Sequence, residues 1–212
     1  MRAYYEERWQ TLPRGVPAHE LAARRAWLLS RVSAGDAVLD VGCGAGQFAR
    51  ALADAGARVI AVDIAEAALA RAREAVPEAE LHRWPEEGRL PLPDASIDVV
   101  WAGEVLEHVA DTAAWLSELW RVLGAGGRLL ISTPSHDRLG NLLIALVGFE
   151  RHADPLGEHL RFYTRRSLRS TLEALGFTDV RVAGMGGAPG LRATLLAEAV
   201  RPTVGLRVAS GA

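Results

Sequence analysis

The sequence predicts an α/β fold in which a mostly parallel sheet carries helices on both faces. Short apolar runs alternate with stretches of helical periodicity up to Pro134, and glycine, proline or acidic residues stand at the junctions between them. The chain has 212 residues, of which 50% are hydrophobic and 24% charged, so it can bury one core and is not disordered as a whole. We therefore expect a single domain built around one sheet.

Each element of the first two thirds follows from its own pattern. A helix from Pro17 to about Val32 has apolar residues at helical spacing and a proline in its first turn. Apolar runs that end in an acid or a glycine then alternate with helical stretches that stop near glycine or proline. The expected strands are Ala37–Val41, Arg58–Val62, Ala79–Arg83, Ile97–Trp101 and Arg128–Ser132, and the helices between them are Gly46–Ala55, Ala65–Ala75 and Thr112–Leu123.

The last third of the chain follows a different pattern. A helix is expected from about Arg165 to Leu175, and two strands, Asp179–Ala183 and Arg192–Val200, should form a hairpin-like pair at the sheet edge. The apolar segment Asn141–Gly148 is too short to span a bilayer, which needs about 20 residues. It could be a lid over a hydrophobic substrate, a dimer contact, a membrane-surface patch or an ordinary buried helix.

Charge and composition exclude several classes of function. The net charge of −2 gives no basic surface of the kind that neutralises a phosphate backbone, so we expect no nucleic-acid partner. Every basic residue is arginine, which excludes a lysine Schiff base and a phosphate-binding lysine of the Walker type. The single cysteine cannot form an internal disulfide, and the polar start MRAYYEERWQ does not resemble a signal peptide. We therefore expect a cytoplasmic protein.

The segment VLDVGCGAGQFAR holds the most informative motif of the chain. Gly42, Gly44 and Gly46 follow the first expected strand, at a turn where glycine lets the backbone pass close beneath a ligand. Asp63 closes the next strand 19 residues beyond Gly44, which is the spacing of a carboxylate that binds ribose hydroxyls. A tight turn without a ligand, and a helix cap at Asp63, are the plainer alternatives.

Two classes of cofactor fit this arrangement, a dinucleotide and S-adenosylmethionine. Gln47 stands where the dinucleotide pattern Gly-x-Gly-x-x-Gly has its third glycine, which disfavours a pyrophosphate site. S-adenosylmethionine has no phosphate, and its ammonium group needs an acceptor such as Asp40. The turn therefore favours S-adenosylmethionine.

Four segments together resemble the class I S-adenosylmethionine-dependent methyltransferases. They are VLDVGCGAGQFAR, VIAVDIAEAALARAR, LPLPDASIDVVWAGEVLEHVAD and GRLLISTP, which lie within about Ala34–Pro134. The later GEHLRFYTRRSLRSTLEALGFTDVRV is similar to the C-terminal third of small-molecule methyltransferases, the quinone-type O-methyltransferases included. The resemblance implies a Rossmann-like seven-stranded sheet with an antiparallel last strand. It divides the single domain into a helical cover (1–33), a cofactor-binding core (34–134), a substrate-side insertion or lid (135–163) and a C-terminal part of helix and edge strands (164–212).

The resemblance also implies roles for individual residues. Gly42 and Gly44 would line the methionine part of the cofactor, Asp63 would hold the ribose and Ile64 would flank the adenine. The family pattern is lost after the third strand, where Trp84 could stack on the purine or simply fill the core, and Glu86 could bind the adenine amine instead. The expected cofactor-binding residues are Asp40, Gly42, Cys43, Gly44, Asp63, Ile64, Trp84, Pro85, Gly103 and Glu104. Cys43 itself is expected to be a small packing residue.

A general base would serve any acceptor that keeps a proton. His136 follows the fifth strand directly, and His159 lies in a segment expected to cover the site. Either imidazole could take a proton near neutral pH or make only structural hydrogen bonds. Tyr4, Tyr5 and Trp9 could form an N-terminal cover over the cofactor, although a loosely ordered terminus fits equally well.

Glu104, Glu107 and His108 form a Glu-x-x-Glu-His motif whose members would share one face of a helix. Two carboxylates and an imidazole can bind a divalent cation, as this motif does in some quinone-type and RNA-end methyltransferases. Many relatives without a metal carry the same residues, and we predict none here.

Together these observations predict transfer of a methyl group from S-adenosylmethionine to a small molecule, with oxygen as the favoured acceptor atom and S-adenosylhomocysteine as product. The near-zero net charge is compatible with an apolar acceptor. A non-catalytic domain that binds the cofactor, and an NAD-dependent oxidoreductase, are the rival hypotheses. The chain could act as a monomer or a homodimer, and contact with a membrane surface is compatible with the sequence.

Overall fold

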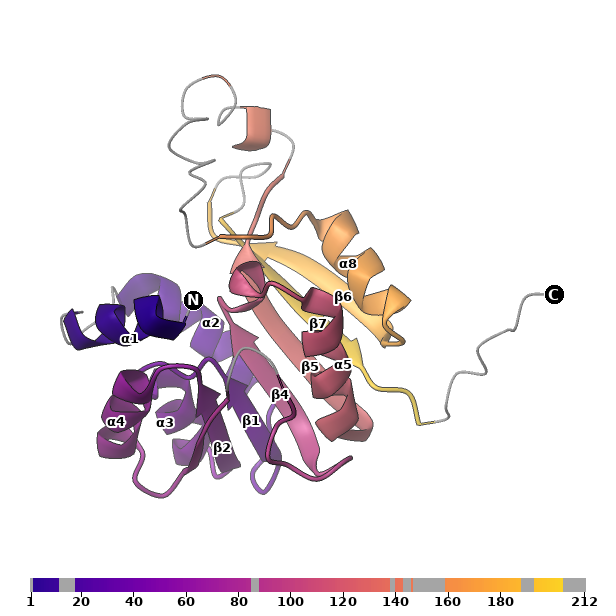
Figure 1. Ribbon diagram of the computed structural model, residues 1–212. Coiled ribbons are helices and arrows are strands. Elements are labelled where there is room, and N and C mark those ends of the chain that lie inside the picture. Colours follow the sequence, from indigo (N-terminus) through magenta and orange to yellow (C-terminus); the bar gives the residue numbers. More distant parts are fainter. Residues whose placement is uncertain are drawn as a thin grey trace.

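A seven-stranded sheet forms the centre of the computed structural model, with the strand order β3-β2-β1-β4-β5-β7-β6 (Figure 1). The structure describes residues 2–11, 18–84, 88–137, 140–142, 146, 159–187 and 193–203. The strands are β1 (Ala37–Val41), β2 (Arg58–Asp63), β3 (Glu80–Arg83), β4 (Ile97–Gly103), β5 (Leu123–Pro134), β6 (Thr178–Met185) and β7 (Thr194–Val200).

The strand directions confirm the predicted mixed sheet. Strands β1 to β5 pair in parallel, whereas β7 runs antiparallel between β5 and β6. Its register extends from Arg128 opposite Val200 to Pro134 opposite Thr194. The order reverses between β1 and β4, and open α/β sheets bind their ligands outside the carboxyl ends of the strands at such a point.

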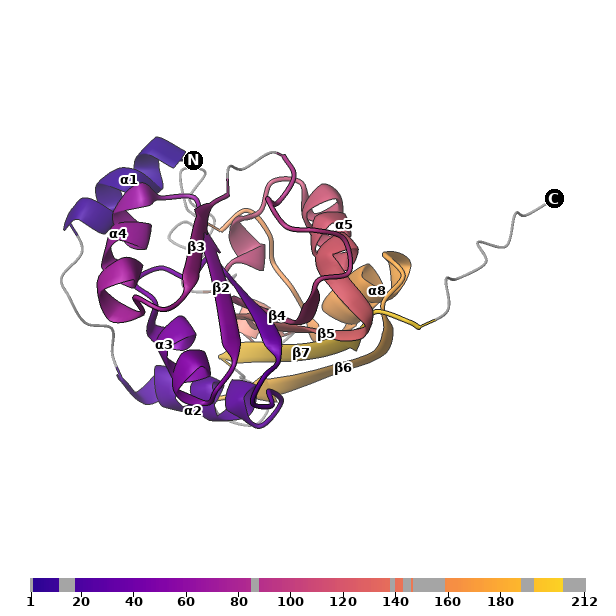
Figure 2. The same cartoon turned by 90° about the horizontal axis from the view of Figure 1, so that it is seen from below.

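The helices cover both faces of the sheet (Figure 2). They are α1 (Arg2–Thr11), α2 (Ala18–Leu29), α3 (Gln47–Asp54), α4 (Glu66–Ala75), α5 (Thr112–Val122) and α8 (Arg165–Ala174), with the short 3₁₀ helix η1 (Leu106–His108) after β4. Among the described residues, no helix combines the length and apolar character that crossing a membrane requires.

Two apolar clusters fix the helices to the sheet. Alternate residues of β1 point to opposite faces, so Val38 packs with residues of α2, α3 and α4 while Leu39 packs with residues of α5 and α8. Both faces of β1 are covered, and all five of its residues are buried. The sheet is thus held rigidly beneath the edge where the glycine turn lies.

Several boundaries differ from the sequence prediction. The polar segment 2–11 forms helix α1, which periodicity does not predict because few of its residues are apolar. β5 begins at Leu123, since the chain stays extended through the glycines that were expected to separate helix from strand. Pro17, Arg192 and most of the apolar segment Asn141–Gly148 lie outside the described residues.

Candidate active site

The turn after β1 requires its glycines. Gly42, Gly44 and Gly46 have φ angles of 67°, 53° and 80°, a region that other residues rarely adopt. The amide of Gly42 donates to the carbonyl of Val62 over 2.8 Å, which presses the turn against β2. A side chain on Gly42 would overlap Val105, which follows β4. The turn therefore sits between the ends of β2 and β4, as the motif predicts.

Asp63 joins this turn to the start of α4. Its carboxylate accepts hydrogen bonds from the amides of Gly44 and Ala65, each over 2.9 Å. Burial raises the pKa of Asp63 above its ordinary value, although these amides oppose the shift. Each oxygen keeps a second lone pair, so the same carboxylate could accept hydrogen bonds from a diol.

Asp40 is a buried carboxylate beside the same turn. Only 1% of the residue is exposed, and its Oδ2 atom has no hydrogen-bond partner. Burial and the charge of Asp63 raise its pKa to about 7, against the amide of Ala49 in α3. An unpartnered buried oxygen is costly, and a cationic donor such as an ammonium group would satisfy it.

Glu104 follows β4 and faces the amino-terminal part of the chain. Its Oε1 atom accepts a hydrogen bond from Ser132 Oγ over 2.9 Å and lies 3.2 Å from a guanidinium nitrogen of Arg24 in α2. The sequence does not indicate that Arg24 lies beside Glu104, because an arginine in a surface helix carries no local signal. Glu104 has φ +57° and η1 has only three residues, so the expected helical face shared with Glu107 and His108 is wrong.

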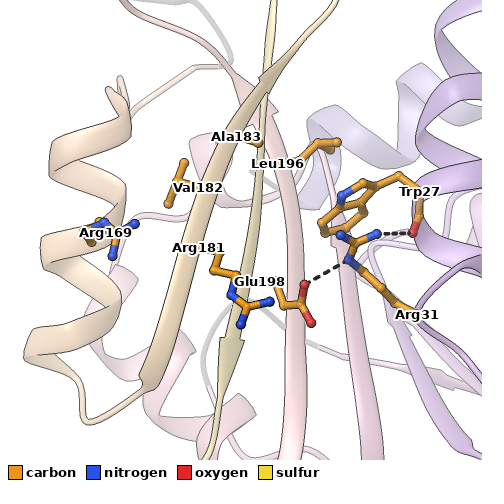
Figure 3. Close-up of a pocket in the computed structure, with 8 residues that line it drawn as sticks. All are labelled: Trp27, Arg31, Arg169, Arg181, Val182, Ala183, Leu196 and Glu198. Atoms are coloured by element: carbon orange, nitrogen blue, oxygen red, sulfur yellow. Dashed lines mark hydrogen bonds and ion pairs between the residues drawn. The ribbon is translucent and has the colours of Figure 1, made fainter.

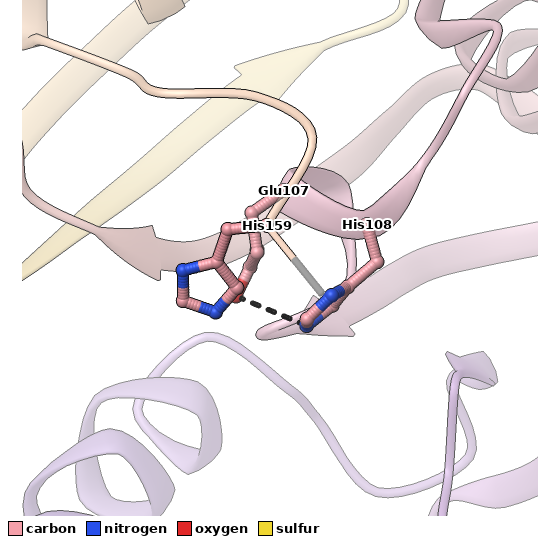
Figure 4. Close-up of side chains that lie close together, drawn as sticks. All are labelled: Glu107, His108 and His159. Carbon is pink, nitrogen blue, oxygen red and sulfur yellow. Dashed lines mark ion pairs between the residues drawn. The ribbon is translucent and has the colours of Figure 1, made fainter. Parts of the chain in front are cut away.

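Glu107 and His108 instead meet His159 (Figure 4). The three offer one ligand atom each, and these atoms lie within 4.8 Å of one another. Glu107 is 1% exposed, and its Oε2 accepts a hydrogen bond from Thr133 Oγ1 over 3.0 Å. Its Oε1 has no hydrogen-bond partner and lies 3.8 Å from Nε2 of His108. The amides after His159 donate to the carbonyl of Glu107, which fixes His159 beside the pair. This cluster, Glu107, His108 and His159, could hold a divalent cation.

Burial also sets the protonation of the cluster. It raises the pKa of Glu107 to about 8, with a contribution from the charge of Glu104. It lowers the pKa of His108 to about 4, with a contribution from His159. At neutral pH the imidazole of His108 is therefore uncharged, which is the form that accepts a proton or binds a metal.

Helix α1 lies over this edge of the sheet and beside α4. A Cβ atom on Gly44 would lie 2.8 Å from two ring atoms of Trp9. The Tyr5 ring makes an edge contact with His108 at 5.9 Å between centroids, and burial raises the pKa of Tyr5 to about 12. The Tyr5 hydroxyl is buried and has no hydrogen-bond partner. These contacts place two aromatic rings beside the carboxylates, and a cover of the cofactor by this segment stays a prediction.

Comparison with known proteins agrees with this geometry. Residues 39–131 match the model of a methyltransferase domain. A "probable S-adenosylmethionine-dependent methyltransferase" of Mycolicibacterium smegmatis is 37% identical over 173 residues, which cover 82% of this chain and 63% of that relative. The chain belongs to the class I S-adenosylmethionine-dependent methyltransferases.

Other relatives extend the comparison. A ubiquinone biosynthesis O-methyltransferase of Pseudomonas putida is 36% identical over 148 residues, which cover 67% of this chain and 63% of the relative. An S-adenosylmethionine-dependent methyltransferase structure from Mesorhizobium loti has a TM-score of 0.66 at 24% identity, over 84% of this chain and 98% of that one, and supports the fold. The methyltransferase chain spans about three fifths of the length of the curated relatives it matches.

Other predicted site residues of the methyltransferase lie elsewhere. Trp84 is buried in the core, stacked on Trp115 of α5 at 6.2 Å, and its indole donates to the carbonyl of Gly88. This position favours core packing over stacking on a purine. His136 is buried against Phe162 and is not a member of the cluster with His159. Pro85 and Glu86 lie outside the described residues.

Contact of the remaining candidates with a cofactor stays a prediction. Ile64 follows Asp63 and is half-buried, and Gly103 ends β4. Cys43 is buried, and burial raises the pKa of its thiol well above the ordinary value, so the thiol is inert as expected.

A pocket of about 300 Å³ lies away from the glycine turn, over β6 and β7 beside α2 and α8 (Figure 3). Arg31 in this pocket packs on Trp27 and forms a 3.0 Å ion pair with Glu198. No predicted site residue of the methyltransferase lines it. The lining residues are Trp27, Arg31, Arg169, Arg181, Val182, Ala183, Leu196 and Glu198.

Proposed function

We propose that this chain transfers the methyl group of S-adenosylmethionine to an oxygen atom of a small acceptor and releases S-adenosylhomocysteine. The observation that carries the proposal is the pair of buried carboxylates, Asp40 and Asp63, on either side of the glycine turn. A ligand with an ammonium group and a ribose diol satisfies both, whereas a phosphate would meet negative charge. This charge pattern argues against the dinucleotide alternative.

Different residues of the chain would bind different parts of the cofactor. Asp40 would accept from the ammonium group, and Asp63 would accept from the ribose while it still holds the turn. The glycines leave room for the methionine part. When bound, the cofactor supplies an electrophilic methyl group on sulfur. The protein's contribution to an in-line displacement is mostly alignment.

A base must take the proton of a hydroxyl acceptor as the new O–C bond forms and the C–S bond breaks. We place this role on His159, because it is exposed and lies at the edge that the cofactor residues share. His136 is the weaker candidate, since it is buried against Phe162. Oxygen is favoured as acceptor atom because two relatives are named O-methyltransferases, of ubiquinone biosynthesis and of malonyl-[acyl-carrier protein].

A divalent cation in the cluster of Glu107, His108 and His159 is the alternative to a base at His159. Oε1 of Glu107, which has no hydrogen-bond partner, and the uncharged His108 suit such an ion, which would displace the proton that Glu107 holds at neutral pH. A cation would bind and polarise the acceptor oxygen. His159 would then serve as ligand and not as base, so the two roles exclude each other.

Calorimetric titration with S-adenosylhomocysteine tests the cofactor site. We expect binding by the wild type and none detectable by Asp63→Ala, with folding checked by circular dichroism. Asp54→Ala is the matched control, because Asp54 is an exposed acid on α3 that pairs with Arg50. Equal affinity of the wild type and Asp63→Ala would overturn the site assignment. Binding without turnover on any hydroxylated acceptor would favour a non-catalytic domain.

A further inference from the structure

We propose that the pocket over β6 and β7 is a second binding site of the methyltransferase, for a small phosphate monoester that carries an apolar group. The pocket lies along the middle of these two strands, whereas methyl transfer is expected at the carboxyl ends of β1, β4 and β5. None of the cofactor or base candidates lines it. Its ligand is therefore neither the cofactor nor the methyl acceptor.

The pocket has an excess of positive charge. Three arginines and one glutamate line it, a net charge of +2, whereas the whole chain has a net charge of −2. Glu198 lies opposite Arg181 in the strand register but forms its 3.0 Å ion pair with Arg31 (Figure 3). Arg169 pairs over 3.6 Å with Glu173 outside the pocket, and both side chains are about half exposed, so this pair is weak. The guanidinium of Arg181 pairs with no carboxylate among the described residues.

Arg31 is held in place and keeps one nitrogen for a ligand. Its guanidinium lies 4.0 Å from the centre of the Trp27 ring, and its Nε donates to Glu198. Its Nη1 donates to the carbonyl of Trp27 over 3.0 Å and to Ser30 Oγ over 2.9 Å. Its Nη2 has no acceptor among the described residues. Because the side chain is already fixed, it loses little further freedom when Nη2 donates to a ligand oxygen.

Apolar side chains form the rest of the pocket wall. Leu196 of β7 is 4% exposed and lies opposite Ala183 of β6, on the same face as the Trp27 ring (Figure 3). Val182 completes the apolar part of the lining. A volume of about 300 Å³ is at the lower end for ligand pockets, so the ligand is small. An apolar group on the ligand would pack against this wall.

A phosphate monoester matches both the charge and the donors. Above its second pKa of about 6 it carries two negative charges, which equal the excess charge of the pocket. Guanidinium groups bind phosphate oxygens with paired hydrogen bonds. The carboxylates of Asp40 and Asp63 would repel the same anion at the glycine turn. The two sites therefore select ligands of opposite charge.

Calorimetry with the full chain at pH 8 tests the site with three probes: phenyl phosphate, inorganic phosphate and phenol. We expect phenyl phosphate to bind about tenfold more tightly than inorganic phosphate, which corresponds to removal of roughly 60 Å² of apolar surface from water. Phenol, which has no charge, should not bind detectably at the same concentrations. Saturation with S-adenosylhomocysteine should leave the affinity for phenyl phosphate unchanged, because the sites are separate.

Three variants locate the binding. Arg181→Met should weaken phenyl phosphate about tenfold, the low end for a charged hydrogen bond, because Arg181 is exposed. Arg58→Met, which removes an exposed arginine of β2, is the matched control and should change nothing. Glu198→Gln should tighten binding a few-fold, because it removes a competing charge and its amide oxygen can still accept from Arg31. This last variant decides the matter even if Arg181→Met does not fold.

Several results would each overturn the inference. They are no binding of phenyl phosphate, equal affinity for phenyl phosphate and either other probe, and competition with S-adenosylhomocysteine. Wild-type affinity in Arg181→Met, an equal loss in Arg58→Met, or no gain in Glu198→Gln would also do so. A wild type that binds phenyl phosphate but not S-adenosylhomocysteine would overturn the proposed function and support this site.

Discussion

Asp40 shows how a single buried group links the fold to the chemistry. Its pKa of about 7 lies above the ordinary 3.8, so the folded protein binds a proton that the unfolded chain releases between these values. The free energy of unfolding therefore falls as pH rises through this range. Ionisation of Asp40 therefore lowers the free energy of unfolding of the cofactor-free protein at neutral and higher pH. A bound ammonium group would offset this loss.

The first prediction concerns stability. Urea unfolding of the cofactor-free wild type should show a free energy of unfolding that declines by about 1 kcal/mol or more between pH 6 and pH 8.5. In Asp40→Asn the decline should be smaller by about 1 kcal/mol, because one titrating group is gone, and Glu107, whose pKa burial raises to about 8, should account for a remaining decline. Asp54→Asn, an exposed change on α3, should keep the wild-type decline. An identical pH trend in wild type and Asp40→Asn would contradict the assignment.

The second prediction concerns binding. Ammonium binding requires ionised Asp40, so the affinity for S-adenosylhomocysteine should rise from pH 6 to pH 8, by at most about tenfold for each pH unit below the pKa of about 7. The affinity for 5′-methylthioadenosine, which lacks the amino-acid part and so has no ammonium group, should show a much smaller trend. If the affinities for both ligands changed equally with pH, a group other than Asp40 would be responsible for the pH dependence.

The residues at strand ends could be predicted from the sequence, and the residues brought in by packing could not. The sequence indicates Asp40 and Asp63 because each stands in or at the end of a short apolar run beside a local turn. Arg24 and Tyr5 come from other helices, and only the packing of α1 and α2 brings them to the site. Trp84 was ambiguous, since an aromatic residue after a strand suits both a ligand and a core.

At the scale of elements, a carboxylate of α1 caps the start of α4 and so holds α1 in place. The amides of Glu66 and Ala67 at the start of α4 donate to the carboxylate of Glu6 over 2.8 and 3.1 Å. The N-cap residue of α4, Ala65, offers no side-chain acceptor. Glu6 therefore caps α4 in place of a local serine or aspartate. The same hydrogen bonds hold α1 over the site.

The third prediction follows from this cap. Glu6→Gln should accelerate hydrogen exchange at the amides of Glu66 and Ala67 several-fold and lower the free energy of unfolding by about 1 kcal/mol. Glu7→Gln is the matched control, because Glu7 lies next to it on α1 and is exposed. Equal exchange in the two variants would mean that Glu6 does not hold α4.

Periodicity predicts elements with an apolar face and misses the others. The strands and the helices α3, α4, α5 and α8 were placed within a few residues because each buries apolar side chains. Helix α1 is mostly polar, and its position depends on Glu6 and Trp9, whose partners are distant in the sequence. The start of β5 was placed too late, because glycines that usually end an element here continue the strand.

At the scale of the whole molecule, the sheet gathers residues from distant segments at one edge. The reversal of strand order between β1 and β4 brings the glycine turn beside Glu104, and parallel β5 adds Ser132 and Thr133. The segment before α8 returns to the same edge, where its amides bind the carbonyl of Glu107. The sequence could show which strands end here, but it could not show that His159 joins His108.

The fourth prediction tests this long-range connection. A divalent cation bound by Glu107, His108 and His159 would tie η1 to the segment before α8, and a ligand that binds only the folded state raises the melting temperature. We expect Mn²⁺ or Zn²⁺ to raise the Tm of the wild type, a chelator to reverse the rise, and His159→Ala to abolish it. His82→Ala is the control, because this histidine lies on β3 beside Glu80. If neither ion shifts the wild-type Tm at saturating concentration, the cluster holds no cation, and the proposed role of His159 as the base stands.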